Sequence, residues 1–141
     1  MDSEILVRVE ALERRYGDTH AVRGVSFDVK RGEVLGFLGP NGAGKTTTMQ
    51  IIAGVLAPSA GRVVVNGLDI LDEARRAKAR IGYLPEQPPV YRELTVDEYL
   101  TYVARLHGVP RGETKAAVVR ARERCGLADT GGRLIGNLSK G

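Results

Sequence analysis

The chain contains a glycine-rich segment that reads Gly39-Pro40-Asn41-Gly42-Ala43-Gly44-Lys45-Thr46-Thr47 and fits the pattern G-x-x-x-x-G-K-[ST]. A triphosphate needs several backbone N–H groups aimed at one point. Glycine permits the positive φ angles and the close backbone approach that this requires. Lys45 would bring a mobile positive charge to the β and γ phosphates, and the Thr46 hydroxyl can bind Mg²⁺. Thr47 adds a further hydroxyl. The segment therefore predicts a phosphate-binding loop.

The residues on either side of the loop favour the strand–loop–helix arrangement that such a site requires. Residues 34–38 are almost continuously apolar, which is typical of a strand buried on both faces of a sheet. After the loop, apolar residues recur at helical spacing at Met49, Ile52, Ala53 and Leu56. The start of that helix would offer its free N–H groups and the positive end of its dipole to an anion.

The remaining residues up to 87 show the patterns of further strands. Apolar and polar residues alternate in the segments 5–9 and 25–29. Three valines, at 63–65, precede the turn pair Asn66-Gly67. Residues 81–84 are expected to form a short strand that Pro85 closes. The sequence predicts an α/β part over residues 1–87.

The pattern changes to helix in residues 88–141. Thr95 and Glu98 fit a capping box, in which each side chain satisfies a free backbone N–H, and an apolar stripe follows them. A second helix is expected from about residue 113 to residue 125, with Gly126 as its left-handed cap.

Composition narrows the class of protein. The chain has 141 residues, of which 43% are hydrophobic and 27% charged, as in soluble globular domains. No apolar run approaches the roughly 18 residues of a membrane helix, and the first residues do not resemble a signal peptide. We therefore expect a cytoplasmic protein.

The net charge of +4 does not by itself indicate a nucleic-acid partner. The arginines interleave with acidic residues, as on solvated helix faces, and no basic strand carries the aromatic residues that stack on bases. We expect no nucleic acid among the partners.

The single cysteine, Cys125, excludes an internal disulfide and a multi-cysteine metal site. Its helical spacing from Val118 and Ala121 predicts a buried thiol.

The segment GPNGAGKTT closely resembles the Walker A loop of ATP-binding-cassette (ABC) ATPases, and the resemblance extends over nearly the whole chain. It implies ATP and Mg²⁺ as cofactors. Tyr16 lies 23 residues before Gly39, where this family has the aromatic residue that stacks on adenine. An aromatic face suits a purine, and stacking contributes roughly 1–3 kcal/mol.

Two further motifs resemble those of the family. Ile81-Gly82-Tyr83-Leu84-Pro85-Glu86-Gln87 resembles the Q-loop, with Glu86 where the family has glutamine and Gln87 one position later. The resemblance implies that Glu86 acts beside Mg²⁺ and the attacking water, and that this loop meets a membrane subunit. Leu138-Ser139-Lys140-Gly141 resembles the start of the signature motif LSGGQ. It implies that Ser139 and Gly141 contact the ATP of a second subunit.

Taken together, the resemblance implies a P-loop NTPase core of the ABC ATPase type. An antiparallel β flank would belong to residues 1–87, and residues 88–141 would begin the helical subdomain. Pro85-Glu86 in the Q-loop together with the signature at 138–141 resembles the branch of the family that handles multidrug, sodium and gliding-motility export. The partners would be a membrane-spanning permease and a second ATP-binding subunit in a head-to-tail dimer. The chain would lie on the inner face of the membrane through the permease.

Some of the family's catalytic parts have no counterpart in the sequence. No Walker B strand ending in Asp-Glu is present, and neither His20 nor His107 lies where the switch histidine belongs. The chain therefore reads as truncated within the helical subdomain. We expect it to bind ATP without efficient hydrolysis.

The sequence offers three alternative functions. A GTPase is the nearest, because residues 129–132 match D-x-x-G, but no apolar strand leads into them and no Asn-Lys-x-Asp is present. The others are a fragment of an ABC ATPase that acts outside transport and a non-catalytic nucleotide-binding module. The motifs do not identify a cargo or its direction.

Overall fold

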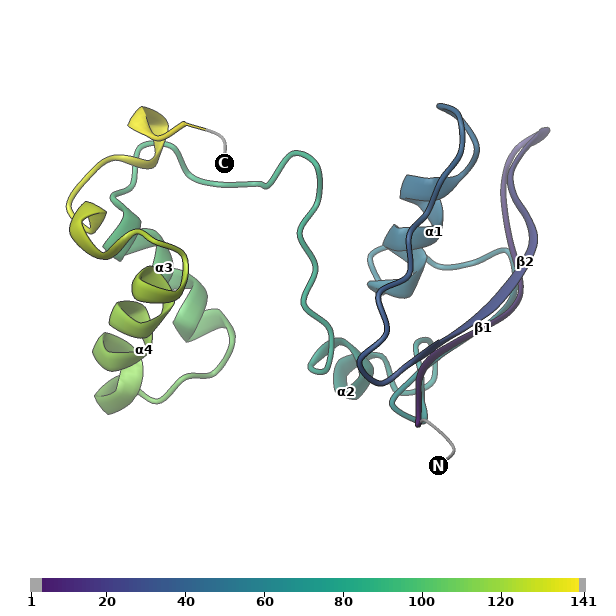
Figure 1. Ribbon diagram of the computed structural model, residues 1–141, viewed down its shortest axis with the longest axis horizontal. Coiled ribbons are helices and arrows are strands. Elements are labelled where there is room, and N and C mark those ends of the chain that lie inside the picture. Colours follow the sequence, from purple (N-terminus) through teal and green to yellow (C-terminus); the bar gives the residue numbers. More distant parts are fainter. Residues whose placement is uncertain (1–3, 140–141) are drawn as a thin grey trace. The chain divides into compact units, whose positions relative to one another are not determined.

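The structure is a computed structural model that describes residues 4–139 (Figure 1). The chain divides into two compact units between Leu84 and Pro85. The boundary expected from the sequence lies three residues later, between Gln87 and Pro88. Within the described residues, no helix is both long enough and apolar enough to cross a membrane.

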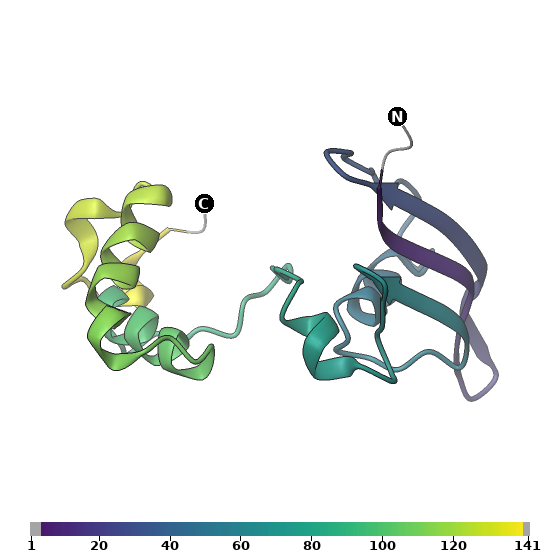
Figure 2. The same cartoon turned by 90° about the horizontal axis from the view of Figure 1, so that it is seen from below.

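The first unit is built on an antiparallel sheet whose strands are ordered β2-β1-β3-β4 (Figure 2). The strands are β1 (Ile5–Tyr16), β2 (Thr19–Lys30), β3 (Ala60–Val65) and β4 (Leu68–Asp69). They confirm the strands predicted at 5–9, 25–29 and 63–65 and the antiparallel β flank. Asn66 and Gly67 both have positive φ, at 48° and 75°, as a tight hairpin turn requires.

A β-bulge interrupts β1 between Val9 and Leu12. Ala11 takes a φ of 44° there, and its N–H donates to Ser26 Oγ at 2.8 Å. Opposite the bulge, Gly61 lies so close that a Cβ on it would meet the Ala11 oxygen at 2.3 Å. The bulge turns Leu12, which is fully buried, into the core.

Helices α1 (Lys45–Ile52) and α2 (Ala74–Lys78) lie on one side of the β1–β2 hairpin (Figures 1 and 2). Ile51 of α1 and Ala77 of α2 are both completely buried. They join the sheet's inward residues in one core, which consists of Val9, Leu12, Val22, Ile51, Val63, Val65, Ile70 and Ala77. The predicted helix after the glycine-rich loop is confirmed.

The predicted strands at 34–38 and 81–84 are wrong for this structure. Both segments are extended without strand pairing in the described part of the chain. Val34 is 96% exposed, Leu38 97% and Leu84 81%. A strand needs a neighbour to accept and donate its backbone hydrogen bonds, and the sheet β2-β1-β3-β4 offers these segments none.

The second unit packs helix α3 (Val96–Leu106) against α4 (Arg111–Arg124), followed by the short 3₁₀ helices η1 (Ala128–Thr130) and η2 (Ile135–Asn137). The capping box at the start of α3 is confirmed: Glu98 N–H donates to Thr95 Oγ1 at 3.2 Å, and Thr95 N–H donates to Glu98 Oε2 at 2.8 Å. The hydrogen bonds from Thr95 lower the pKa of the Glu98 carboxyl. Gly126 has a φ of 68°, as a left-handed cap does.

The prediction of a buried Cys125 is wrong, because the thiol is exposed. Helix α4 ends at Arg124, one residue before it. The residues of α4 that turn inward are spaced by four: Thr114 and Val118 are buried, and the mostly covered Arg122 lies 3.2 Å from Asp97. Cys125 stands beyond the last of these contacts.

Leu12 gives a test of the core of the first unit. Leu12→Ala removes a fully buried side chain, so the free energy of unfolding should fall by about 2–5 kcal/mol. Urea denaturation followed by circular dichroism measures it. The matched variant Leu71→Ala, at a side chain 55% exposed, should change stability much less. Equal losses would contradict the assigned core.

Candidate phosphate-binding site

The glycine-rich loop is held against strand β2 by a close approach at Gly44. Gly42 and Gly44 both have a φ of 83°, in the left-handed region that glycine favours. A Cβ on Gly44 would lie 2.3 Å from the Ala21 carbonyl oxygen and 3.2 Å from a methyl of Val22. Only glycine therefore fits between the loop and β2 without a backbone shift.

Helix α1 begins directly at this contact. Its first residue is Lys45, its N-cap is Gly44, and no side chain of residues 4–139 caps its N-terminus. The first helical hydrogen bond runs from Thr48 N–H to Gly44 O at 2.8 Å. The N–H groups of the first turn are thus left to face the loop, where they and the helix dipole favour an anion.

A cavity of about 490 Å³ opens at this helix terminus. The loop and the first turn of α1 contribute lining residues that carry backbone N–H groups, one ammonium and two hydroxyls, and the start of β2 contributes the others. The lining residues are Thr19, His20, Ala21, Arg23, Asn41, Gly42, Ala43, Gly44, Lys45, Thr46 and Thr47. The predicted residues from Asn41 to Thr47 are therefore brought together in one place.

Gly39 and Pro40 have a different position in the loop. They do not line the cavity; their carbonyl oxygens accept hydrogen bonds from Lys45 Nζ, which lies 2.7 Å from the oxygen of Pro40. These bonds hold the ammonium group across the loop. Pro40 O also accepts from Ala43 N–H at 3.2 Å, which closes the turn.

Sequence reasoning missed His20 and Arg23. Both come from β2, whose start is brought to the loop by the hairpin with β1. Arg23 Nε donates to the His20 carbonyl at 3.2 Å, and His20 Nε2 lies 3.4 Å from Glu13. No motif marks either residue. Only the pairing of the two strands places them beside the loop.

Tyr16 stands at the end of β1 and pairs with Thr19, one of the cavity-lining residues. Its side chain is 46% exposed, so part of the ring is open to a ligand. The guanidinium carbon of Arg14 lies 4.6 Å from the ring centroid. Tyr16 itself is not part of the cavity wall.

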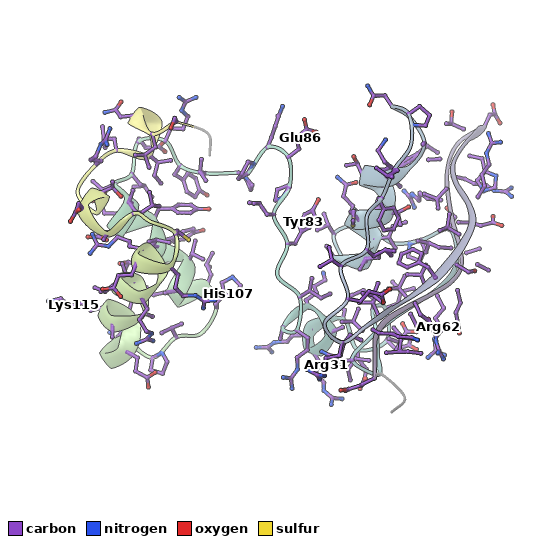
Figure 3. All side chains as sticks on the ribbon, in the orientation of Figure 1. Arg31, Arg62, Tyr83, Glu86, His107 and Lys115 are labelled. Carbon is purple, nitrogen blue, oxygen red and sulfur yellow. The ribbon has the colours of Figure 1, made fainter. Side chains whose placement is uncertain are left out.

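The other predicted site residues belong to the second unit. Glu86 is exposed on the extended segment that precedes α3, as Figure 3 shows. Among the described residues, no hydrogen bond or ion pair ends on its carboxylate. Ser139 is exposed and lines a separate cavity of about 520 Å³ with Pro88, Val90, Arg92, Ile135 and Leu138. Gly141 lies outside the described residues.

Comparisons with known proteins agree with one another. The model of a family described as ABC transporter matches residues 22–141. The ABC transporter ATP-binding protein NatA of Bacillus subtilis is 39% identical over 96% of this chain and 57% of its own length. The linearmycin resistance ATP-binding protein LnrL of the same species is 35% identical over 96% of this chain and 44% of its own length.

The solved structure of cbiO1 from Clostridium perfringens, part of the ABC transporter complex cbiONQ, resembles this chain with a TM-score of 0.81 at 30% identity. The match covers 96% of this chain and 56% of that one. The chain thus spans about half the length of the relatives it matches.

The two left-handed glycines of the loop make a matched pair of variants. Alanine at either position should cost about 1–2 kcal/mol for its backbone conformation. Gly44→Ala should cost about 1–3 kcal/mol more, because its Cβ meets the Ala21 oxygen, whereas a Cβ on Gly42 meets nothing within 4 Å. Urea denaturation of both variants measures the difference. Equal losses of stability in the two variants would mean that the contact between Gly44 and β2 does not restrict the residue at position 44.

Proposed function

The chain belongs to the ABC transporter family of ATP-binding proteins, and we propose that the cavity at the start of α1 binds the phosphates of MgATP. The observation that carries the proposal is that the uncapped N-terminus of α1, Lys45 and the threonines at 46 and 47 belong to the lining of one cavity in the first unit. All of these groups favour an anion that accepts several hydrogen bonds.

Different residues of the loop would bind different parts of the triphosphate. The backbone from Asn41 to Gly44 would surround the β phosphate, and Lys45 would neutralise charge on the β and γ phosphates. Lys45 would exchange its bonds to loop carbonyls for bonds to phosphate. Thr46, which lines the cavity, would supply its hydroxyl oxygen to Mg²⁺.

The Mg²⁺ site would take most of its ligands from phosphate and water. Among residues 4–139, no group of three or more His, Cys, Asp or Glu side chains gathers to hold a metal ion. Mg²⁺ commonly uses one or two protein oxygens beside substrate phosphates, so Thr46 fits this donor set. In our proposal Glu86 acts on the metal and water side, with Gln87 as the neighbouring alternative.

Tyr16 would hold the adenine ring. Its position beside Thr19 supports this role, since Thr19 lines the phosphate cavity and the phenol ring is half exposed. Stacking on the ring gives the base an attachment that the phosphate loop does not supply.

We further propose that the complete protein couples ATP binding and hydrolysis to transport across a membrane. A membrane-spanning permease would contact the region 85–91, and a second ATP-binding subunit would receive Ser139 and Gly141 across a head-to-tail dimer. The protein would then work at the cytoplasmic face of the membrane. The cbiO1 relative, which is part of an ABC transporter complex, supports an assembly of this kind.

Lys45→Ala tests the proposed phosphate site. Loss of a charge-assisted contact of roughly 1.5–3 kcal/mol should lower the affinity for MgATP about tenfold or more. Titration calorimetry on the wild type and the variant measures it. Lys115→Ala, on α4, is the control and should bind as the wild type does. If Lys45→Ala also binds equally well, the loop is not the site.

Tyr16 is tested by comparing ATP with inorganic triphosphate. Tyr16→Ala should weaken the binding of ATP by roughly 1–3 kcal/mol and leave the binding of triphosphate unchanged, because only ATP has a base that can stack on the ring. Tyr16→Phe keeps the ring and should bind both ligands normally. Equal losses for the two ligands in Tyr16→Ala would remove the adenine assignment.

Turnover should be slow in this chain by itself. The Asp-Glu pairs of its sequence, at 72–73 and 97–98, lie just before α2 and within α3 and do not end a strand. Loss of a general base commonly lowers a rate by roughly 10²–10⁴. The turnover rate is measured as steady-state phosphate release from ATP, with the Lys45→Ala variant as the background. A rate of about 1 s⁻¹ or faster that Lys45→Ala abolishes would contradict this expectation.

A further inference from the structure

Arg14 has contacts that the phosphate site does not explain. The pairing of β1 with β2 shifts register between Arg14 and Arg15, and the Arg14 guanidinium carbon lies 4.6 Å from the centroid of the Tyr16 ring. This is within the range of a cation–π contact. One face of the phenol ring is therefore covered by a cation, while the side chain as a whole stays 46% exposed.

The guanidinium is fixed in this position from the other side. Its Nη1 donates to the carbonyl oxygen of Ala57 at 3.0 Å, in the segment that follows α1. Its Nε is fully covered and makes no hydrogen bond within the described part of the chain. Arg14 thus connects the Tyr16 ring to the chain leaving the helix that begins at the phosphate loop.

We infer that Arg14 is a positioning residue for the purine: it supports the Tyr16 ring from one face so that adenine stacks on the opposite face. The inference rests on the proposed function, in which Tyr16 holds the base. It adds a layer to that contact, so that guanidinium, phenol ring and purine form a three-part stack.

Two physical effects make this arrangement favourable. A tyrosine ring carries negative charge density on both faces, which opposes stacking by another π system. A cation on one face draws that density toward itself and leaves the opposite face better suited to a purine. The contact also restricts the rotation of a half-exposed side chain, so less conformational entropy is lost when the base binds.

The experiment compares the affinities for MgATP and for inorganic triphosphate in four variants of this chain. Arg14→Met keeps the aliphatic stem but removes the cation and the bond to Ala57. Its affinity for MgATP should fall about two- to fivefold, the range of an exposed cation–π contact, and its affinity for triphosphate should not change. Arg14→Lys keeps a cation and should fall between Arg14→Met and the wild type.

Arg15→Met is the matched control, since it removes the same charge one residue along β1 and should leave both affinities unchanged. Tyr16→Ala, the fourth variant, separates this inference from the proposed function. The quantity compared is the affinity for MgATP divided by the affinity for triphosphate. If Tyr16→Ala lowers this ratio and Arg14→Met does not, Tyr16 remains the adenine contact and the role of Arg14 is overturned. If Tyr16→Ala leaves the ratio unchanged, both assignments are overturned.

The affinity for triphosphate also reports whether the loop remains folded. If the affinity of Arg14→Met for triphosphate falls as well, the contact with Ala57 is needed for the fold of the loop, and the ratio of the affinity for MgATP to that for triphosphate decides. An unchanged ratio in Arg14→Met then overturns the inference. A higher affinity for ATP in either Arg14 variant overturns it too, because Arg14 would then occupy the face that the base needs.

Discussion

The close approach of Gly44 to strand β2 is the constraint on which the phosphate site depends. The Ala21 carbonyl oxygen occupies the space that any side chain at position 44 would need. Because this contact fixes the loop, helix α1 begins at Lys45 with its free N–H groups facing the loop. The same contact brings the start of β2 into the cavity wall. The wall opposite the loop, including His20 and Arg23, is thus a consequence of one residue without a Cβ.

The parts that the sequence predicted well are those specified by neighbouring residues. The glycine-rich turn that opens onto helix α1 and the capping box at Thr95 each need only a short run of the chain, and each has a motif with a physical reason. The alternation of β2 likewise predicts a strand with one buried face. Local chemistry was enough for these elements.

The features that could not be predicted from the sequence depend on contacts between residues far apart in the chain. His20 and Arg23 enter the cavity through the pairing of β1 with β2 and carry no motif of their own. Residues 34–38 have the composition of a buried strand, but a strand also requires a hydrogen-bonding neighbour, and composition does not reveal whether one is present. Cys125 has core-like spacing, yet α4 ends one residue before it.

The exposed apolar segment before the phosphate loop has a consequence for how the chain behaves in solution. Val34 and Leu38 are almost fully exposed, and their backbone has no strand beside it within the described residues. A segment with unpaired backbone and apolar side chains is a template for strands of other molecules. Pairing of this segment with a further strand would satisfy its backbone groups, bury both side chains and hold the backbone that leads into the loop at Gly39.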